Sequence, residues 1–114
     1  MANDGTTRSI SLSNGSTSER IMIRYAATEN ALYFYCIQDG NSRAIITTSS
    51  YNLLEFNKIA ASYKQNDFKL YVNGVLIGTD NNGNVPSGLN QLNFNQGDGN
   101  QPFFGKTKAL AVWK

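Results

Sequence analysis

Histidine is absent from the 114-residue sequence, and cysteine occurs only once. Without an imidazole the chain has no Ser-His-Asp or Cys-His nucleophile and no histidine-based acid–base catalysis, and most zinc sites are excluded too. The single cysteine, Cys36, has no partner for an intrachain disulfide. Because it stands in the apolar stretch Tyr33-Phe34-Tyr35-Cys36-Ile37, we expect a buried and unreactive thiol.

An excess of one charge and long apolar runs are also missing. Ten Lys and Arg residues against eight Asp and Glu residues give a net charge of only +2, and the basic residues are scattered. Binding of nucleic acid by counterion release needs a clustered basic face, so we expect no nucleic-acid partner. No apolar run reaches the roughly 18 residues of a membrane span, and the first residues show no signal-peptide pattern. The sequence therefore predicts no membrane partner.

The sequence is rich in aromatic residues and glycine, with six Tyr, six Phe and ten Gly against two Pro. This composition favours strands and turns, and no stretch keeps a helical period over three turns. A helical turn is favoured only at 51–55. The predicted strands are 7–12, 19–26, 31–38, 43–48, 57–64, 67–73, 75–79, 90–95 and 103–113. The chain is therefore predicted to be one all-β domain, residues 1–114, built as an antiparallel two-sheet sandwich.

Two turns fix the register of the segment 57–79. Asn73-Gly74 is a strong hairpin signal, because both central positions of a type I′ turn need a positive φ. It pairs Val72 with Val75 and Leu70 with Ile77. A turn at Gln65-Asn66 pairs Tyr63 with Phe68, Ala61 with Leu70 and Ile59 with Val72. Both turns place Leu70 and Val72 on the same, buried face.

The segment 19–48 predicts a second meander. A loop at 27–30 pairs Tyr25 with Leu32, Ile23 with Phe34 and Ile21 with Cys36. A turn at 39–42 then pairs Cys36 with Ile45 and Phe34 with Thr47. The opposite face of these strands collects Arg20, Met22, Arg24, Tyr33, Tyr35, Ile37 and Ile46. That face is either covered by other protein or forms an exposed aromatic patch that stacks on a ligand.

Two blocks of the sequence carry a family resemblance. Asn57-Lys58-Ile59-Ala60-Ala61-Ser62-Tyr63-Lys64, followed by Phe68-Lys69-Leu70-Tyr71-Val72-Asn73-Gly74-Val75, resembles the central strands of laminin-G/concanavalin-A-like lectin/glucanase domains. The stretches 92–95 and 104–113 look like the closing strands of that family. The loop Gly97-Asp98-Gly99-Asn100 is similar to such domains in phage tail or surface proteins. The resemblance implies a concanavalin A-like jelly roll on a virion or extracellular surface.

The resemblance also implies that the domain is trimmed at both ends and lacks one or more N-terminal strands of the full family fold. An edge strand would then be exposed, and exposed edges are templates for pairing with another chain. We therefore expect a homo-oligomer, or pairing with a neighbouring segment, through 7–12 or 103–113.

Catalysis and metal binding have little support in the sequence. Glycoside hydrolysis, which occurs in the family, needs two carboxyl groups facing each other across a cleft. The glutamates Glu19, Glu29 and Glu55 all lie in loops or at strand ends, so we expect no enzyme. We also expect no cofactor, since the loops 80–84 and 95–100 do not match an EF-hand. If an ion binds there, the candidate calcium ligands are Asp80, Asn82 and Asp98.

Carbohydrate recognition is the chemistry that the outward-facing residues suit best. Sugar rings stack on aromatic side chains, and planar polar groups beside them bind the hydroxyls. The candidate glycan-binding residues are Arg24, Tyr33, Tyr35, Lys69, Tyr71, Asp98 and Asn100. The sequence thus predicts a non-catalytic recognition module for glycan or another surface ligand. The alternative is a structural domain that assembles through its edge strands and binds no small ligand.

Overall fold

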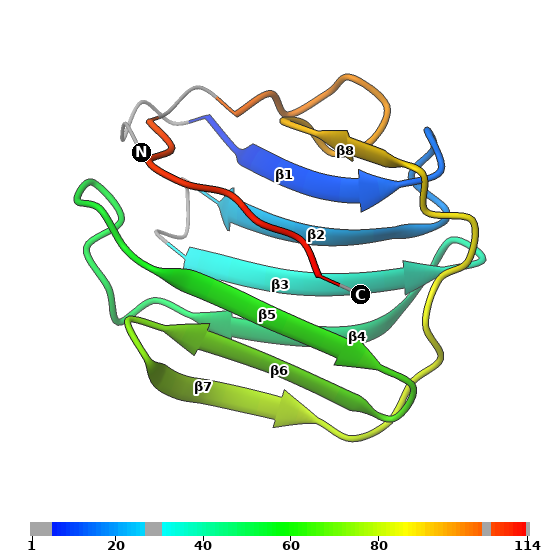
Figure 1. Ribbon diagram of the computed structural model, residues 1–114, viewed down its shortest axis with the longest axis horizontal. Coiled ribbons are helices and arrows are strands. Elements are labelled where there is room, and N and C mark those ends of the chain that lie inside the picture. Colours follow the sequence, from blue (N-terminus) through cyan, green and yellow to red (C-terminus); the bar gives the residue numbers. More distant parts are fainter. Residues whose placement is uncertain (1–5, 27–30, 104–105, 114) are drawn as a thin grey trace.

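The computed structural model describes residues 6–26, 31–103 and 106–113, which contain eight β-strands and no helix. The strands are β1 (Arg8–Ser13), β2 (Arg20–Ala26), β3 (Ala31–Gln38), β4 (Asn41–Thr48), β5 (Ile59–Lys64), β6 (Asp67–Val72), β7 (Val75–Asp80) and β8 (Gln91–Asn93) (Figure 1). At 51–55, where a helical turn was favoured, the chain makes only a turn, closed by a bond from Glu55 N to Asn52 O. Within these described ranges, no helix could cross a membrane.

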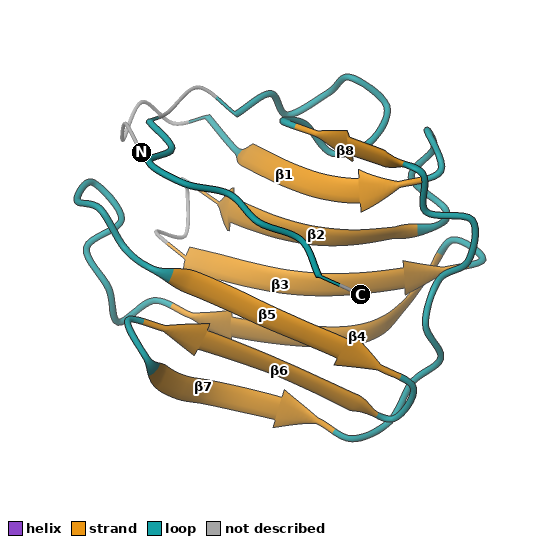
Figure 2. Cartoon of the chain, in the orientation of Figure 1, coloured by secondary structure: helices purple, strands orange, loops and turns teal. Residues whose placement is uncertain are grey.

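The strands form two antiparallel sheets that lie one over the other (Figures 1 and 2). One sheet has five strands in the order β4-β3-β2-β1-β8, and the other has three in the order β5-β6-β7. The backbones of the two sheets approach each other most closely at β4, which lies beside β7 and β6. The predicted all-β, antiparallel two-sheet sandwich is confirmed.

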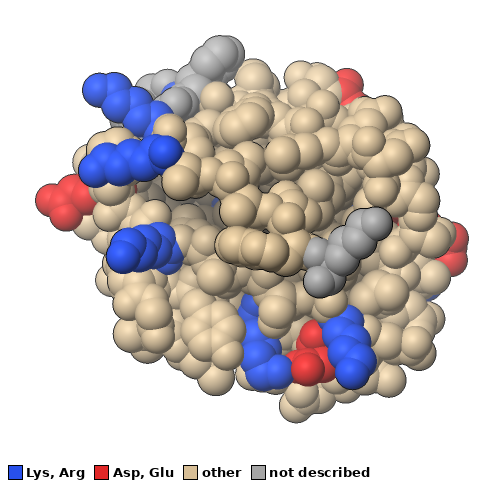
Figure 3. All heavy atoms as spheres, viewed as in Figure 1, with Lys and Arg blue, Asp and Glu red and all other residues tan. Residues whose placement is uncertain are grey.

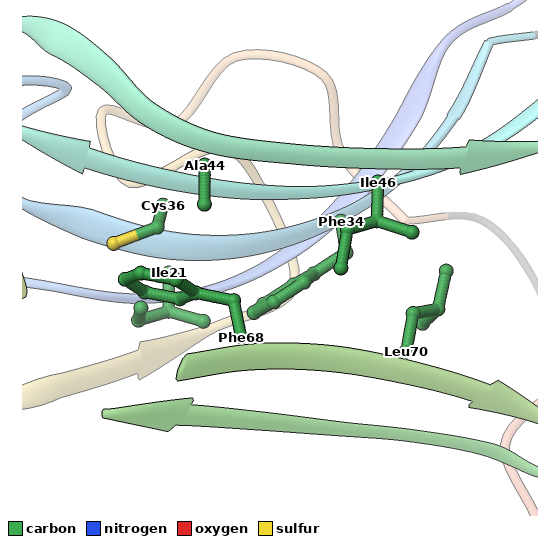
Figure 4. Close-up of a cluster of buried hydrophobic side chains, with 7 residues drawn as sticks. All are labelled: Ile21, Phe34, Cys36, Ala44, Ile46, Phe68 and Leu70. Carbon is green, nitrogen blue, oxygen red and sulfur yellow. The ribbon is translucent and has the colours of Figure 1, made fainter. Parts of the chain in front are cut away.

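Alternate residues of the strands fill the space between the sheets. Phe34 from β3 meets Phe68 and Leu70 from β6, and all three are fully buried (Figure 4). Fully burying an apolar side chain of this size contributes roughly 1.5–3 kcal/mol. Cys36 lies in the same cluster, and burial raises the pKa of its thiol to about 11. The burial expected from the sequence is thus confirmed, and a raised pKa disfavours the thiolate, which is the reactive form.

The predicted hairpin registers are largely confirmed. Tyr63 pairs with Phe68, Ala61 with Leu70, Ile59 with Val72, and Val72 with Val75. Between β2 and β3, Tyr25 pairs with Leu32, Ile23 with Phe34 and Ile21 with Cys36. The turns have the backbone that their residues favour, with φ of 59° at Asn66, 52° at Asn73 and 82° at Gly74.

Two β-bulges make the rest of the predicted pairing wrong by one residue. A bulge between Leu70 and Tyr71 sets Leu70 opposite Gly78 instead of Ile77. A Cβ atom added to Gly78 would lie 3.0 Å from the Cγ2 atom of Ile46, so glycine allows β7 to approach β4 closely.

The second bulge, between Cys36 and Ile37, shifts the pairing of β3 with β4. Cys36 pairs with Ala44 instead of Ile45, and Phe34 pairs with Ile46 instead of Thr47. Ile46 therefore enters the core, whereas it was predicted on the opposite face, and Ile45 is 47% exposed. An extra residue in one strand exchanges the two faces beyond it.

The two predicted exposed edge strands are also corrected. The segment 7–12 is not an edge, because β1 lies between β2 and β8. The described part of 103–113 contains no strand, and Phe104 and Gly105 lie outside the described residues. Alternation of apolar residues was the signal for that strand, but among the described residues no strand pairs with it. That N-terminal strands of a fuller fold are lacking stays a prediction.

Candidate functional site

Three of the predicted binding residues meet on the outer face of the five-stranded sheet. Arg24 on β2 stands opposite Tyr33 on β3, and Tyr35 lies two residues along on the same face. The Nη2 atom of Arg24 donates a hydrogen bond of 3.0 Å to the hydroxyl oxygen of Tyr35. We call Arg24, Tyr33 and Tyr35 the aromatic platform.

The platform is held together by contacts between its own members. The rings of Tyr33 and Tyr35 are stacked, with centroids 5.4 Å apart and planes 15° from parallel. The guanidinium carbon of Arg24 lies 5.2 Å from the Tyr33 centroid and 4.8 Å from the Tyr35 centroid. Cation–π contacts of this kind fix the orientation of both partners. All three side chains remain partly exposed, so a ligand can reach them.

A long loop, 94–102, covers the neighbouring strand on the same face. Ser9, Ser11 and Ser13 point outward from β1, yet each is at most 1% exposed. The hydroxyl of Ser11 donates to the carbonyl oxygen of Asn95 at 2.8 Å. Ser9 bonds Gln101 twice, through its hydroxyl at 2.9 Å and its backbone amide at 3.1 Å.

Small residues are required on both sides of this contact. Gly97 has a φ of 112°, and a Cβ atom there would lie 2.8 Å from the carbonyl oxygen of Ser16. The same Cβ atom would lie 3.2 Å from the side chain of Ser13. Glycine in the loop and serine on the strand therefore allow the loop to lie flat on the sheet.

Arg20 connects this loop to the platform. Its Nη1 atom donates a 2.7 Å hydrogen bond to the carbonyl oxygen of Gln96. Burial lowers the pKa of its guanidinium, and the nearby charge of Asp98 opposes that shift. Arg20 stands four residues before Arg24 on the same face of β2, so the loop that it bonds lies beside the platform.

Asp98 and Asn100 stand on this loop as an ordered, exposed pair. The carboxylate of Asp98 accepts hydrogen bonds from the backbone amide of Asn100 at 2.9 Å and from its side-chain amide at 3.1 Å. The side-chain amide of Gln96 donates to the same carboxylate at 3.0 Å. The backbone bond from Asn100, followed by the bond from Gln96, lowers the pKa of Asp98.

The structure does not bring Lys69 and Tyr71 to the platform. Both lie on the outer face of β6, in the other sheet, so they face the opposite side of the sandwich. The ammonium group of Lys69 forms an ion pair with Asp67, and this hydrogen bond raises the pKa of Lys69. The seven candidates thus divide into a group of five on one face and a pair on the other.

The candidate calcium ligands do not form a cluster. The carboxylate of Asp80 accepts a hydrogen bond from the amide of Asn82 at 3.1 Å, while Asp98 belongs to the loop described above. Asn82 lines a polar cavity of about 290 Å³ in which the one charged lining residue is the cationic Arg43. Among the described residues, no three Asp, Glu or Cys side chains are placed to hold a metal ion.

The carboxylate of Glu19 has a structural role. It accepts backbone hydrogen bonds from Asp39 at 2.8 Å and from Ser87 at 2.9 Å, and these bonds lower its pKa. Glu19 therefore connects two loops as an ionised group. A general acid of a glycosidase needs the opposite shift. Glu29 lies outside the described residues.

Sequence reasoning placed Arg20 on this face but not among the binding residues, and it missed Gln96 and the three serines as parts of the face. A signal for them was present, because Ser9, Ser11 and Ser13 alternate with Ile10 and Leu12. Three small polar residues on one face of a strand leave room for another segment to pack there.

The comparisons with known proteins agree on the architecture. The family described as the concanavalin A-like lectin/glucanases superfamily matches residues 1–114. A comparison with curated proteins finds no match. Among solved structures, the carbohydrate binding module CBM66 from Bacillus subtilis is similar, with a TM-score of 0.53 and 10% identity. The match covers 72% of this chain and 52% of the module, so the chain spans about half the length of that structure. At this identity the likeness concerns the fold.

Proposed function

The chain belongs to the concanavalin A-like lectin/glucanases superfamily, and we propose that within it the protein is a non-catalytic module that binds carbohydrate. The observation that carries this proposal is the aromatic platform, in which two tyrosine rings and a guanidinium are already in contact. Aromatic rings pack against the C–H groups of a sugar, and planar donors bind its hydroxyls. Because the three side chains are ordered beforehand, binding costs less conformational entropy.

Two further observations support recognition without catalysis. A solved structure with a similar fold is named as a carbohydrate binding module, which is a non-catalytic kind of domain. The chain also lacks histidine, and backbone amides hold Glu19 in its ionised form. Loop 94–102 would border the ligand, with Asp98 and Asn100 as polar groups beside the rings.

Affinity electrophoresis in gels that contain soluble polysaccharides, followed by a glycan array, tests this function. We expect at least one polysaccharide to retard the protein, and we expect the variant Tyr35→Ala to lose that retardation. Tyr71→Ala, on the outer face of the other sheet, is the matched control and keeps it. Retardation that survives Tyr35→Ala, or the absence of any glycan ligand, contradicts the proposal.

The setting belongs to the same proposal. The sequence resembles domains of phage tail or surface proteins, so we propose a virion or extracellular surface as the place of action. Mass spectrometry of purified particles and of cell fractions tests the setting. Recovery of the chain from the cell interior alone contradicts it.

The second candidate function is assembly, and one observation favours it. Among the described residues, β5 has a neighbouring strand on one side only, so its other edge is open. Open edges support pairing with further polypeptide.

A further inference from the structure

A large cleft separates β5 from the C-terminal segment 106–113. Its volume is about 1050 Å³, and Ile10 and Ile23, on the inner face of the five-stranded sheet, form its floor. In Figure 1 the segment 106–113 crosses this sheet in the same direction as β5 runs. Within the part of the chain that the structure describes, the three-stranded sheet therefore leaves the β1–β2 half of the larger sheet uncovered by any paired strand.

The walls of the cleft are apolar and accessible. Leu54 and Phe56 on one side are 57% and 55% exposed, and Leu110 and Trp113 on the other are 45% and 81% exposed. Apolar side chains that gather around one hollow, instead of being scattered, mark an interaction site.

The backbone of β5 offers hydrogen bonds toward this cleft. The carbonyl oxygen of Lys58 accepts a hydrogen bond from the backbone amide of Asn73, so Lys58 and Asn73 form a hydrogen-bonded pair of the antiparallel ladder. Opposed residues of antiparallel strands alternate between hydrogen-bonded and non-hydrogen-bonded pairs. The amides and carbonyls of Ile59, Ala61 and Tyr63 therefore point away from β6, toward the open edge.

The charge around the cleft is predominantly positive. Its lining includes the exposed side chains of Lys58, Lys106 and Lys108 and the buried Arg8, against one acidic residue, Glu55. Basic side chains gather at one end of this side of the molecule, at the left of Figure 3. Lys108 has its ammonium nitrogen 4.2 Å from the ring centroid of Phe56. A ligand of complementary charge is acidic.

We propose that this cleft binds an extended segment of another polypeptide, in which apolar and acidic side chains alternate, as a strand added to β5. The apolar side chains would face Ile10 and Ile23, and the acidic ones would face outward among the lysines. The backbone of the added strand would pair with Ile59, Ala61 and Tyr63. This interaction is independent of carbohydrate binding, which uses the other face of the five-stranded sheet.

Trp113 is the natural probe for the test, because it lines the cleft and is the one tryptophan of the chain. A synthetic peptide of about eight alternating valine and glutamate residues matches the length of a strand. We expect it to shift the Trp113 emission to the blue in a saturable way. A valine–lysine peptide, and a valine–glutamate peptide with a central proline, should each bind about tenfold more weakly or worse.

Two pairs of variants test the protein side. Lys58→Glu combined with Lys106→Glu should weaken binding of the valine–glutamate peptide about tenfold, whereas Lys64→Glu, outside the cleft, should not. Ala61→Pro removes an amide that points to the open edge without removing a bond to β6. Thr79→Pro is its control. The backbone amide and carbonyl of Lys69 point toward β5, so the backbone of Thr79, which stands opposite Lys69 on β7, also points away from β6.

Four results would overturn the proposal. The first is no saturable binding of the valine–glutamate peptide. The second is equally tight binding of the proline-containing peptide, because that result excludes binding as a strand paired with β5. The third is a blue shift of the Trp113 emission with laurate but not with the peptide, because the cleft would then bind an amphiphile. The fourth is a dimer, seen by sedimentation, that the peptide neither binds nor dissociates, because a second copy then fills the cleft.

Discussion

The outer faces of the two sheets carry the same kinds of side chain but organise them differently. On the five-stranded sheet, Arg24 contacts two tyrosines, and a loop borders the group. On the three-stranded sheet, Lys69 and Tyr71 also combine a cation with an aromatic ring, but Lys69 is paired with Asp67. Residue type and strand parity favour both faces equally as binding sites. The faces differ in the partner of the cation, which is a pair of tyrosine rings on one face and a carboxylate on the other. They also differ in that loop 94–102 lies beside the cation on the five-stranded face.

The largest effect should come from disturbing the covered part of the five-stranded face. Ser11→Leu places a large side chain under loop 94–102 and removes the bond to Asn95. We expect a loss of about 2–4 kcal/mol in the free energy of unfolding, from overpacking and an unpaired carbonyl. Ser62→Leu, on the exposed face of β5, should change it by about 0.5 kcal/mol at most. Urea unfolding of both variants measures the difference, and equal losses would contradict the described packing.

A smaller effect should follow from removing the cation on each face. Arg24→Ala deletes the guanidinium that contacts both rings and bonds Tyr35. We expect a glycan affinity about tenfold lower, since a hydrogen bond to a charged group is worth about 1.5–3 kcal/mol. Lys69→Ala should leave the affinity unchanged. Isothermal titration with the glycan that the array selects measures both, and a loss with Lys69→Ala would move the site to the other sheet.

The two faces should also respond to opposite extremes of pH. The pKa of Asp98 is lowered from 3.8, so its hydrogen bonds are present above that value and are lost as the pH falls through the lowered pKa. The pKa of Lys69 is raised from 10.5, so its ion pair is present below that value and is lost as the pH rises through the raised pKa. Glycan affinity should therefore be constant from neutral pH to about pH 4 and decline below it. Titration followed by NMR at Asn100 and Lys69 checks both directions.

The smallest expected effect is that of calcium. Asp80 and Asp98 already accept hydrogen bonds from their own loops, and Arg43 lines the cavity beside Asn82. We expect millimolar calcium to leave the melting temperature unchanged, because an ion that bound the folded state would raise it. A rise that the variant Asp98→Asn abolishes would show that the loop binds calcium after all.

Much of the fold could be predicted because single residues decide the turns. Asn73-Gly74 and Asn66 favour positive φ, and they fixed the pairing of β5, β6 and the start of β7. The bulges at Cys36 and Leu70 could not be predicted, since an extra residue in a strand leaves no mark in its composition. The last apolar segment has the alternation of a strand, but strand formation needs a neighbouring edge, and the sequence does not show where that edge lies.

The candidate site was predictable to a similar degree. Strand parity placed Arg24, Tyr33 and Tyr35 on one face, and the structure brings them into contact. Parity could not decide that Lys69 and Tyr71 face the opposite side, because the sheet to which a strand belongs depends on long-range packing. The docking of loop 94–102 on the serines of β1 depends on residues more than eighty positions apart, such as Ser11 and Asn95.

The most direct test of carbohydrate recognition by the five-stranded face is an NMR titration of the ¹⁵N-labelled protein with an oligosaccharide selected on the array. We predict that the perturbed amides and side chains cluster at Arg20, Arg24, Tyr33 and Tyr35 and in loop 94–102, with no change at Lys69 or Tyr71. Perturbations confined to the outer face of β6, or to the cleft beside β5, would contradict it.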